Sequence, residues 1–531
     1  MSTLLELTHD IQAQEEAIRH GGGEAGRQRQ EQLGRLTVRP RLAELVDEGA
    51  PLWELGLWAA WRMYADWGEV PAAGVVTGIA AVHGRPVLIV ANDATVKAGA
   101  LFPQSVKKVL RAQRIAMRFR LPLVYLVDSS GVFLPLQDEI FPDEDDFGRI
   151  FRNNAVISAM GIPQYAAVMG NCVAGGAYLP VLSDTLLMTE GSQLYLAGPA
   201  LVKAAIGQEV DAEELGGARM HAQISGTADY RDPDDHACLR RLRSLIDRLP
   251  PAPDDADGRQ APARDPQELY PLVSADGRSA YDARELLACL VDAGSLDEFR
   301  AEYGRTLVTA FARIDGQHVG IVASQRQRCR AGSGELQIGG VLYADSAEKA
   351  ARFVVECDRT GVPLVFFQDV QGFMVGKQAE QSGIIRAGAK LVHAVSNAVV
   401  PKLTVVVGGS FGAGNYALCG KAYDPWLILA WPSARYAVMG AHQAADTLLS
   451  LQLREAQRAG RPLAEAESRR LREEICGRYE EQTDIRYGAA RGWVDAIIAP
   501  HETRQWLAAA LRMIPPRSTW KEFHPGTWPV L

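Results

Sequence analysis

The chain has 531 residues, of which 47 % are hydrophobic and 23 % charged, and its formal net charge at pH 7 is −8. The acidic balance disfavours a nucleic-acid-binding protein, which normally carries a basic domain, and no apolar run approaches the ~18 residues of a membrane-spanning helix. The seven scattered cysteines indicate a reduced, cytoplasmic protein. Since no cysteine or histidine spacing is typical of zinc ligands, we expect no metal on this chain.

The first half of the chain predicts a layered α/β unit. Residues 1–70 are expected to form a helical lead-in. In chain order, the pattern then predicts two strands within 74–93 that turn at 83–85, a helix over 104–118, a strand over 121–128, a helix over 147–160, and a strand over 162–170 that runs into a glycine-rich segment. Residues 249–265 are rich in Pro, Asp, Gly and Ala and predict a linker. We therefore expect a first domain over 71–265.

The second half predicts the same order of elements, starting near Glu285 and forming a domain over 266–515. It contains a charged helical stretch over 448–479 that has no clear counterpart in the first half. A short strand or turn is expected over 492–498, then a helix over 501–514 and a polar tail over 516–531. Alternating strands and helices in both halves favour the α/β class.

Individual residues also repeat in order. Gly99, Ser105, Lys108 and Arg111 recur 241 positions later as Gly340, Ser346, Lys349 and Arg352, and Asp128 and Gly131 recur as Asp369 and Gly372. Further along, Gly170, Gly176 and Tyr178 recur 238 positions later as Gly408, Gly414 and Tyr416. Two diverged copies of one fold predict two related sites with different tasks, as in a two-substrate enzyme. A solenoid would need several short stacked repeats.

A glycine-rich turn follows a strand in each copy, over 173–178 and 411–416. Small residues at a strand-to-helix turn let a ligand approach the backbone, and the unpaired N–H groups of a helix start favour negative charge. We predict that Gly175 and Gly176 form one oxyanion hole and that Ala413 and Gly414 form another. Close packing or phosphate binding are the alternatives, but neither run ends in the Gly-Lys-Ser/Thr of a phosphate loop.

Asp128 and Asp369 each follow a buried strand. They could shape the edge of a pocket, where open α/β sheets place ligands, or they could cap backbone groups of a turn. Gly131 and Gly372 are expected to offer further N–H groups. The helix predicted over 383–390 brings Arg386 and Lys390 together, either as solvated charges or as a pocket wall.

Catalytic signatures are sparse elsewhere. No G-x-S-x-G nucleophile motif occurs, and neither His221 nor His442 has a Ser or Cys partner suggested by spacing. If the enzyme forms an enolate, its base is therefore expected to lie outside the protein side chains. A crotonase-type hydratase would need carboxylates near the glycine-rich turns, and none is present in these runs. A non-catalytic scaffold is disfavoured because both turns are intact.

Long stretches of the chain resemble the carboxyltransferase (β) subunits of biotin-dependent acyl-CoA carboxylases, most of all those of 3-methylcrotonyl-CoA carboxylase. The resemblance is carried by residues 91–155, 170–180, 196–221 and 368–426 and covers roughly residues 30–515. It implies two tandem crotonase-like (ClpP/crotonase superfamily) β-β-α domains. The first would bind acyl-CoA and the second biotin.

The resemblance also implies distinct roles for the two turns. Gly175 and Gly176 would stabilise the thioester enolate of the acyl-CoA, whereas Ala413 and Gly414 would bind the ureido oxygen of biotin. The implied mechanism is substrate-assisted, with biotin rather than a protein base taking the proton. Substrate contacts are expected from Gly131, Ala174, Tyr195, Gly198, Gly372, Phe373 and Gly412.

The family resemblance implies partners as well. The chain has no biotinyl Ala-Met-Lys-Met segment, so biotin would be carried by a separate α subunit that contains biotin carboxylase and biotin carboxyl carrier regions. One pocket would combine two subunits, which implies a homo-oligomer of at least two chains, and a hexamer in an α6β6 complex is expected.

The acyl group is less narrowly defined. The resemblance favours 3-methylcrotonyl-CoA, with geranyl-, propionyl- and longer-chain acyl-CoA as alternatives. Ser130 stands where we expect glycine, and Tyr195 stands where we expect phenylalanine and is predicted to line the acyl pocket. Residues 341–353 also resemble the α subunit of glutaconyl-CoA decarboxylase.

Overall fold

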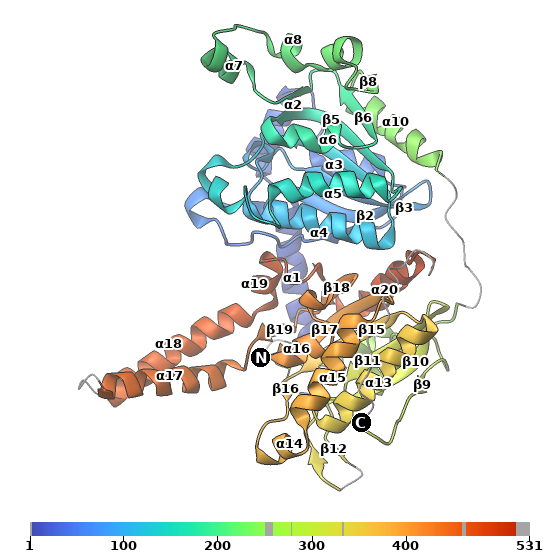
Figure 1. Ribbon diagram of the computed structural model, residues 1–531, viewed down its shortest axis with the longest axis vertical. Coiled ribbons are helices and arrows are strands. Elements are labelled where there is room, and N and C mark those ends of the chain that lie inside the picture. Colours follow the sequence, from blue (N-terminus) through green and yellow to red (C-terminus); the bar gives the residue numbers. More distant parts are fainter. Residues whose placement is uncertain (1–2, 250–258, 278, 332–333, 459–463, 517–531) are drawn as a thin grey trace. The chain divides into compact units, whose positions relative to one another are not determined.

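A computed structural model describes residues 3–249, 259–277, 279–331, 334–458 and 464–516 (Figure 1). The chain separates into two compact units. The N-terminal unit consists of Gln12–Asp254 and Ala489–Gly492, and the C-terminal unit of Met1–Ile11, Asp255–Gly488 and Trp493–Leu531. Most of the expected linker over 249–265, and the expected tail beyond residue 516, lie outside the described residues.

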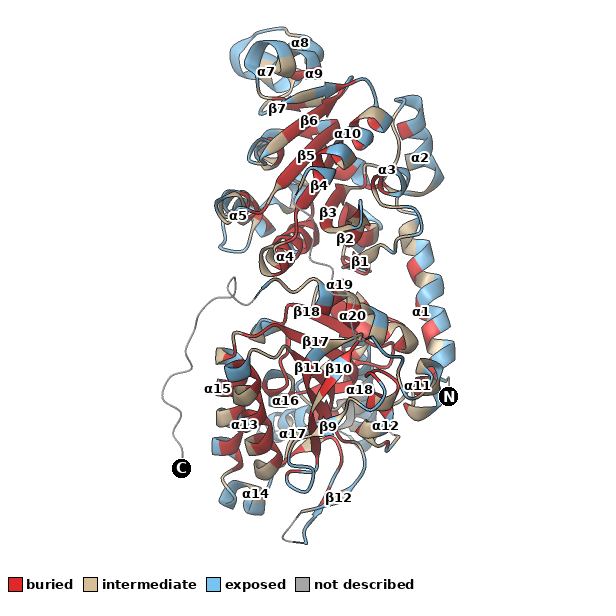
Figure 2. Cartoon of the chain, turned by 90° about the vertical axis from the view of Figure 1, so that its right-hand side faces the viewer, coloured by how far each residue is buried: buried red, intermediate tan, exposed pale blue. Residues whose placement is uncertain are grey.

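The N-terminal unit is built on an eight-stranded sheet, counted over the described residues, with the order β1-β2-β3-β4-β5-β6-β8 and β7 paired with β5. Its strands are β1 Trp53–Leu55, β2 Val75–Val82, β3 Arg85–Asn92, β4 Leu123–Ser129, β5 Gln164–Val173, β6 Thr185–Thr189, β7 Gln193–Tyr195 and β8 Tyr230–Asp232. β2 and β3 form an antiparallel hairpin, and β3 to β6 run parallel. Their near-continuous apolar composition suits a sheet that is covered on both faces (Figure 2).

The helices of this unit pack on its sheet or lie in the connection between β7 and β8. They are α2 Gly23–Gln32, α3 Val38–Leu45, α4 Pro103–Phe119, α5 Phe147–Ala159, α6 Tyr178–Val181, α7 Pro199–Ile206, α8 Ala212–Gly216, α9 Ala218–Met220 and α10 Asp235–Asp247, while α1 covers Leu4–Arg19. α3 and α10 contact each other and share one core with β2 to β6. α4 and α5 contact each other, and apolar residues of both are buried.

The C-terminal unit repeats this plan in a second eight-stranded sheet, again counted over the described residues, with the order β20-β18-β17-β15-β11-β10-β9 and β19 paired with β17. Its strands are β9 Asp297–Glu298, β10 Leu307–Ile314, β11 Gln317–Ser324, β15 Leu364–Val370, β17 Lys402–Phe411, β18 Leu427–Ala430, β19 Arg435–Ala437 and β20 Ala496–Ile497; the short strands β12 Cys329–Arg330, β13 Leu336–Gln337, β14 Val341–Leu342 and β16 Gly372–Phe373 lie outside this sheet. Each main strand therefore has a counterpart in the N-terminal unit, and the predicted duplication and α/β class are confirmed.

The helices of the C-terminal unit follow the same plan. They are α11 Leu269–Leu272, α12 Ala283–Ala288, α13 Ala344–Thr360, α14 Lys377–Gln381, α15 Ile384–Asn397, α16 Ala413–Ala417, α17 Ala441–Arg458, α18 Glu465–Thr483, α19 Ile485–Ala490 and α20 Thr503–Arg512. α13 and α15 lie side by side over one face of the sheet and share its core (Figure 1). α20 packs against β10 and β11.

The repeat also reaches upstream into the region expected to be a lead-in. Leu42–Asp47 and Leu287–Asp292 correspond, and each ends in an aspartate that accepts the two backbone N–H groups of a hairpin turn. Asp47 binds the N–H groups of His83 and Gly84 at 2.9 and 2.7 Å. Asp292 binds the turn between β10 and β11 in the same way, with both distances at 2.8 Å. Both hairpin turns have two positive φ angles, as type I′ turns require.

The charged stretch over 448–479 has a counterpart in position, although not in sequence, in the N-terminal unit. It lies within two helices, α17 and α18, which contact each other and extend away from the sheet of the C-terminal unit (Figure 1). They occupy the connection between β19 and β20, and in the N-terminal unit the connection between β7 and β8 contains α7, α8 and α9. The two excursions share a position in the fold but no sequence pattern.

Most other predicted elements are confirmed within a few residues, including the hairpin of β2 and β3, helices α4 and α5, and the final helix α20. None of the seven cysteines, all of which lie in the described residues, forms a disulfide bond. In the part of the chain that the structure describes, no helix is long and apolar enough to cross a membrane.

Candidate active site

The glycine-rich turn of the N-terminal unit begins where β5 ends. The last residues of β5 pair with β7, and Val173 lies beside Tyr195. Ala174 follows with a φ of 58°, a left-handed conformation that is uncommon for a residue with a Cβ. The chain then enters a short 3-10 helix over Ala174–Ala177, in which Gly175 and Gly176 are half-buried. Their N–H groups lie in the first turn, where no acceptor exists within the helix.

The C-terminal unit builds the corresponding turn in the same way. β17 ends beside β19, with Phe411 paired with Ala437. Gly412 has a φ of 54°, close to the value at Ala174, and its N–H group donates to the carbonyl of Ala437 at 2.9 Å. α16 starts at Ala413, so the N–H groups of Ala413 and Gly414 again belong to a first turn. Both units thus present two adjacent N–H groups directly after one left-handed residue.

This geometry suits the stabilisation of negative charge on an oxygen atom. Backbone N–H groups fixed before the reaction cost no reorganisation when charge develops, which is the physical basis of an oxyanion hole. Among the described residues, no group of three or more His, Cys, Asp and Glu side chains is placed to hold a metal ion.

Asp128 and Asp369 lie behind these turns and bind backbone groups. The Asp128 carboxylate accepts the N–H of Asn171 at 3.2 Å, and that of Asp369 accepts the N–H of Gly409 at 2.9 Å. Burial raises the pKa of both carboxyl groups, while Arg41 and Arg326 oppose the shift. The contacts favour the backbone-capping interpretation over the pocket-edge alternative.

The loops that follow the aspartates are bound to the sheet edge. The N–H of Gly131 donates to the hydroxyl of Ser129 at 3.1 Å, so this donor is already engaged. Gly372 lies in β16, which pairs with β14, and has a φ of 130°. The ring of Phe373 packs against Gly388 on α15. A Cβ on Gly388 would lie 3.0 Å from this ring, which explains why a small residue occurs there.

Tyr195 lies on β7 directly beside the first turn. Its hydroxyl donates to the side chain of Gln193 at 2.8 Å, and burial raises its pKa. A Cβ on Gly198 would lie 3.2 Å from the ring, and one on Gly216 would lie 2.6 Å from it. The two glycines therefore hold the ring between them. In the C-terminal unit, the residue at this position is Ala437, so the two turns have neighbours of very different size.

The other singled-out side chains have local contacts. His221 contacts the carbonyl of Leu194 at 2.6 Å through Nε2 and the hydroxyl of Ser225 at 2.9 Å through Nδ1. Lys390 forms an ion pair with Glu348 at 3.1 Å, whereas Arg386 on the same helix is exposed. The solvated-charge interpretation fits Arg386. The side chain of His442 lies outside what the structure describes.

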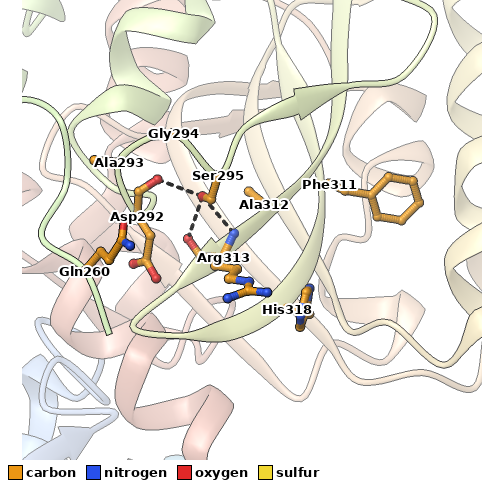
Figure 3. A pocket seen from close by; sticks show the side chains of 9 residues that line it. All are labelled: Gln260, Asp292, Ala293, Gly294, Ser295, Phe311, Ala312, Arg313 and His318. Carbon is orange, nitrogen blue, oxygen red and sulfur yellow. Dashed lines mark hydrogen bonds between the residues drawn. The ribbon is translucent and has the colours of Figure 1, made fainter. Parts of the chain in front are cut away.

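Two pockets in the described residues do not include either turn. One, of about 420 Å³, lies by the hairpin turn of β10 and β11, where Ser295 donates to the carbonyl of Asp292 and accepts from the N–H of Arg313 (Figure 3). The other, of about 720 Å³, lies in the N-terminal unit between the end of α1 and residues 57–72. Neither of these two pockets is lined by the residues of a glycine-rich turn.

Comparisons with known proteins show similarity along most of the chain. The family model described as "Carboxyl transferase domain" matches residues 29–524. The biotin-dependent 3-methylcrotonyl-coenzyme A carboxylase β1 subunit of Mycobacterium tuberculosis is 47 % identical over 497 residues, which cover 93 % of this chain and 91 % of that protein. The mitochondrial methylcrotonoyl-CoA carboxylase β chain of Dictyostelium discoideum is 43 % identical, over 96 % and 84 % of the two chains.

A solved structure supports the same relationship. The β subunit of geranyl-CoA carboxylase from P. aeruginosa superimposes with a TM-score of 0.87 at 34 % sequence identity. The match covers 99 % of this chain and 96 % of that one. The predicted crotonase-like fold is thereby confirmed.

Proposed function

The chain belongs to the carboxyl transferase family, and on that premise we propose that it is the carboxyltransferase (β) subunit of a biotin-dependent acyl-CoA carboxylase, with 3-methylcrotonyl-CoA as its substrate. The observation that carries the proposal is the duplicated turn, which places two adjacent N–H groups in the first turn of a short helix in each unit. Two oxyanion sites suit a reaction in which two different substrates each develop charge on an oxygen.

In the N-terminal unit, the N–H groups of Gly175 and Gly176 bind the thioester oxygen of the acyl-CoA. Charge grows on this oxygen when the carbon skeleton loses a proton, so donors that point at it lower the barrier by several kcal/mol each. Ala174 begins the turn, and the ring of Tyr195, which packs against Gly198, limits the space beside it for the acyl group.

In the C-terminal unit, the N–H groups of Ala413 and Gly414 bind the ureido oxygen of biotin. The first turn of α16 fits this role because its donors have no intrahelical acceptor and Gly412 brings the backbone close to the ligand. Carboxybiotin, carried by a partner subunit, would supply the carboxyl group, and the biotin that remains would take up the proton that the acyl-CoA loses. Gly372 and Phe373 border the same turn: a Cβ on Gly414 would lie 3.4 Å from the Cα of Gly372.

No protein side chain is needed as the base. The carboxylates of Asp128 and Asp369, which lie behind the two turns, accept backbone N–H groups and pair with arginines. This engagement leaves them poorly placed to take a proton from a substrate.

The proposal includes partners and a compartment. A separate α subunit with biotin carboxylase and biotin carrier regions delivers carboxybiotin, and the chain forms a homo-oligomer, a dimer at minimum and a hexamer in the complete complex. Seven cysteines that form no disulfide bond in the structure support a reducing compartment such as the cytoplasm.

The proposal is tested by reconstituting the chain with a biotin-carrying partner, ATP and bicarbonate and offering a panel of acyl-CoA substrates. We expect carboxylation of 3-methylcrotonyl-CoA, and failure with every short and medium acyl-CoA would refute the proposal. The Ala413→Pro variant removes one biotin-side N–H at a helix position that tolerates proline, and it should lower turnover roughly 100-fold. Unchanged turnover in a folded variant would refute the biotin-side assignment.

Geranyl-CoA is a second candidate substrate. It is favoured by the close superposition with a geranyl-CoA carboxylase β subunit. The same panel separates the two candidates, because the preferred substrate is the one with the higher kcat/KM.

A further inference from the structure

The strand that leads into the first turn carries an insertion opposite Asp128. β4 and β5 pair in parallel up to Val127 and Val168, and the next pair is Ser129 with Cys172. Asp128 alone therefore faces residues 169–171. Its Oδ1 accepts the N–H of Asn171 at 3.2 Å, which replaces the ladder bond that the irregularity removes. A Cβ on Gly170 would lie 2.0 Å from this oxygen, so the carboxylate occupies the space that only glycine leaves free.

The C-terminal unit has the same insertion opposite Asp369. β15 and β17 pair up to Gln368 and Val406, and the next pair is Val370 with Ser410. Asp369 faces residues 407–409, and its Oδ1 accepts the N–H of Gly409 at 2.9 Å. A Cβ on Gly408 would lie 2.6 Å from the carboxylate. This match explains why both the aspartates and the two glycines recur in the sequence.

The backbone N–H group that each aspartate binds lies only a few residues before the glycine-rich turn in the sequence. Beyond the insertion, β5 leaves β6 and pairs with β7, beginning at Asn171, while β17 leaves β18 and pairs with β19, beginning at Gly409. The first N–H donor of each turn, Gly175 or Ala413, then follows four residues later. Because this short segment is extended, at roughly 3.3 Å per residue, fixing its start also fixes the place of the turn.

Both carboxylates are held from behind by an arginine, although the arginines come from different places in the repeat. Arg41 lies 3.3 Å from Asp128 and donates to the carbonyl of Met169 inside the insertion at 2.9 Å. Arg326 lies 3.2 Å from Asp369, and the Tyr281 hydroxyl donates to the same carboxylate at 3.1 Å. The aspartate is thus the shared part of the device, and its charge partner has diverged.

We propose that Asp128 and Asp369 are positioning residues, each of which holds one of the two N–H pairs in place through the strand that carries it. This inference rests on the proposed function, since it assigns Asp128 to the acyl-CoA half of the reaction and Asp369 to the biotin half. Neither residue contacts the substrates in this role.

The test compares Asp128→Ala with Asp369→Ala in the full chain assembled with its biotin-carrying partner. Each should lower kcat roughly 10- to 100-fold, because displacing a catalytic group by about 1 Å has effects of this size. The thioester carbonyl stretch of bound acyl-CoA, measured by infrared difference spectroscopy, should lose its shift to lower frequency in Asp128→Ala and keep it in Asp369→Ala. Asparagine at either position still accepts the N–H bond, so Asp128→Asn and Asp369→Asn should recover part of the lost kcat.

Asp47→Ala and Asp292→Ala are matched controls. Like Asp128 and Asp369, the aspartates at these positions accept backbone N–H groups, here two each, and pair with an arginine, but they hold the hairpin turns at the opposite end of the sheets. They should lose comparable stability while keeping kcat. The inference is overturned if Asp292→Ala lowers kcat as much as Asp369→Ala when both variants are folded, or if the carbonyl shift survives in Asp128→Ala.

A separate measurement keeps the inference distinct from the proposed function. If the wild-type chain carboxylates no acyl-CoA, the proposed function fails, and amide hydrogen exchange then judges the positioning role alone. Asp128→Ala should speed exchange over residues 171–178 only, and Asp369→Ala over 409–416 only. Equal exchange in wild type and variants would overturn the positioning role.

Discussion

At the scale of single residues, the two turns share a positive φ angle directly before their N–H pairs, but on different residue types. The left-handed residue is Ala174 in one unit and Gly412 in the other, with φ angles of 58° and 54°. Gly412 has a ψ of −144°, a combination that residues with a Cβ avoid. A Cβ there would also lie 3.0 Å from the carbonyl oxygen of Val438. The C-terminal turn therefore depends on glycine in a way that the N-terminal turn does not.

Gly412→Ala should consequently destabilise the protein by about 1–3 kcal/mol and lower carboxyl transfer, because the strain lies directly before Ala413. Ala174→Gly should change stability by less than about 1 kcal/mol, since relief of the left-handed strain offsets the added freedom of the unfolded chain. Urea denaturation and steady-state kinetics check both variants. Equal effects of the two substitutions would contradict this account.

Tyr195 is the residue at which we expect the acyl group to be selected. Its ring is held between Gly198 and Gly216 beside the first turn. Tyr195→Ala opens space for added methylene groups, each worth about 0.8 kcal/mol when buried, and should raise kcat/KM for geranyl-CoA relative to 3-methylcrotonyl-CoA. The control Tyr195→Phe keeps the ring and loses only the hydrogen bond to Gln193, so its preference should resemble that of the wild type. No change in the ratio for Tyr195→Ala would exclude Tyr195 as a selector.

At the scale of elements, the sequence was sufficient wherever an apolar pattern was continuous. The run over 121–128 became β4, and the periodic segment over 104–118 became α4, because burial on both faces of a parallel sheet and on one face of a helix leaves distinct patterns. The correspondence of α17 and α18 with α7 to α9 could not be predicted from the sequence, because the two segments share only their place in the fold. The role of Asp128 could not be predicted from the sequence either, because it depends on a register shift between two strands.

The match of Leu42–Asp47 with Leu287–Asp292 is detectable in the sequence, because the pattern L-A-x-L-V-D occurs in both segments. It lies outside the strands that carry the more obvious repeat. Its function is structural, since the aspartate at its end binds a hairpin turn and pairs with an arginine, Arg243 in one unit and Arg504 in the other.

Helices α4 and α13 are each anchored by a buried lysine. Lys108 donates to the carbonyl of Ala72 at 3.0 Å, and Lys349 donates to that of Leu307 at 2.9 Å. Burial lowers the pKa of Lys108 to about 7 and that of Lys349 to about 8, against the opposing effects of Glu54 and Glu298. Above these values, the unfolded chain binds more protons than the folded chain until the ordinary lysine pKa is reached, so stability should rise with pH in that window.

Lys108→Met should remove the contribution of this group. Between pH 7 and 9, the slope of the unfolding free energy against pH should fall by up to about 1.4 kcal/mol per pH unit relative to wild type. Lys349→Met should show the same loss starting about one unit higher. Urea denaturation at several pH values measures the slopes, and an unchanged slope in Lys108→Met would show that the lysine keeps its ordinary proton affinity in the fold.

At the scale of the whole molecule, the duplication gives each of the two substrates of the proposed reaction a turn of its own. Each unit has its own sheet, its own strand insertion opposite a buried aspartate, and its own pair of N–H groups. The units differ beside the turn, with Tyr195 in one and Ala437 in the other. The copies are therefore alike in the parts that position the backbone and different in the side chains beside the turns, where the proposed function places the two substrates.

The proposed oligomer joins the N-terminal unit of one chain to the C-terminal unit of another in each pocket, and mixed assemblies test this. Gly175→Pro removes an N–H at the first turn and Ala413→Pro removes one at the corresponding place in the second, so each variant alone should be inactive. When the two variants are refolded together in equal amounts, half of the dimers contain both chains. Each of these has one pocket with two defects and one with none. Activity should return to about one quarter of the wild-type value. If each pocket were formed within a single chain, every pocket would carry one defect, and the mixture would stay inactive.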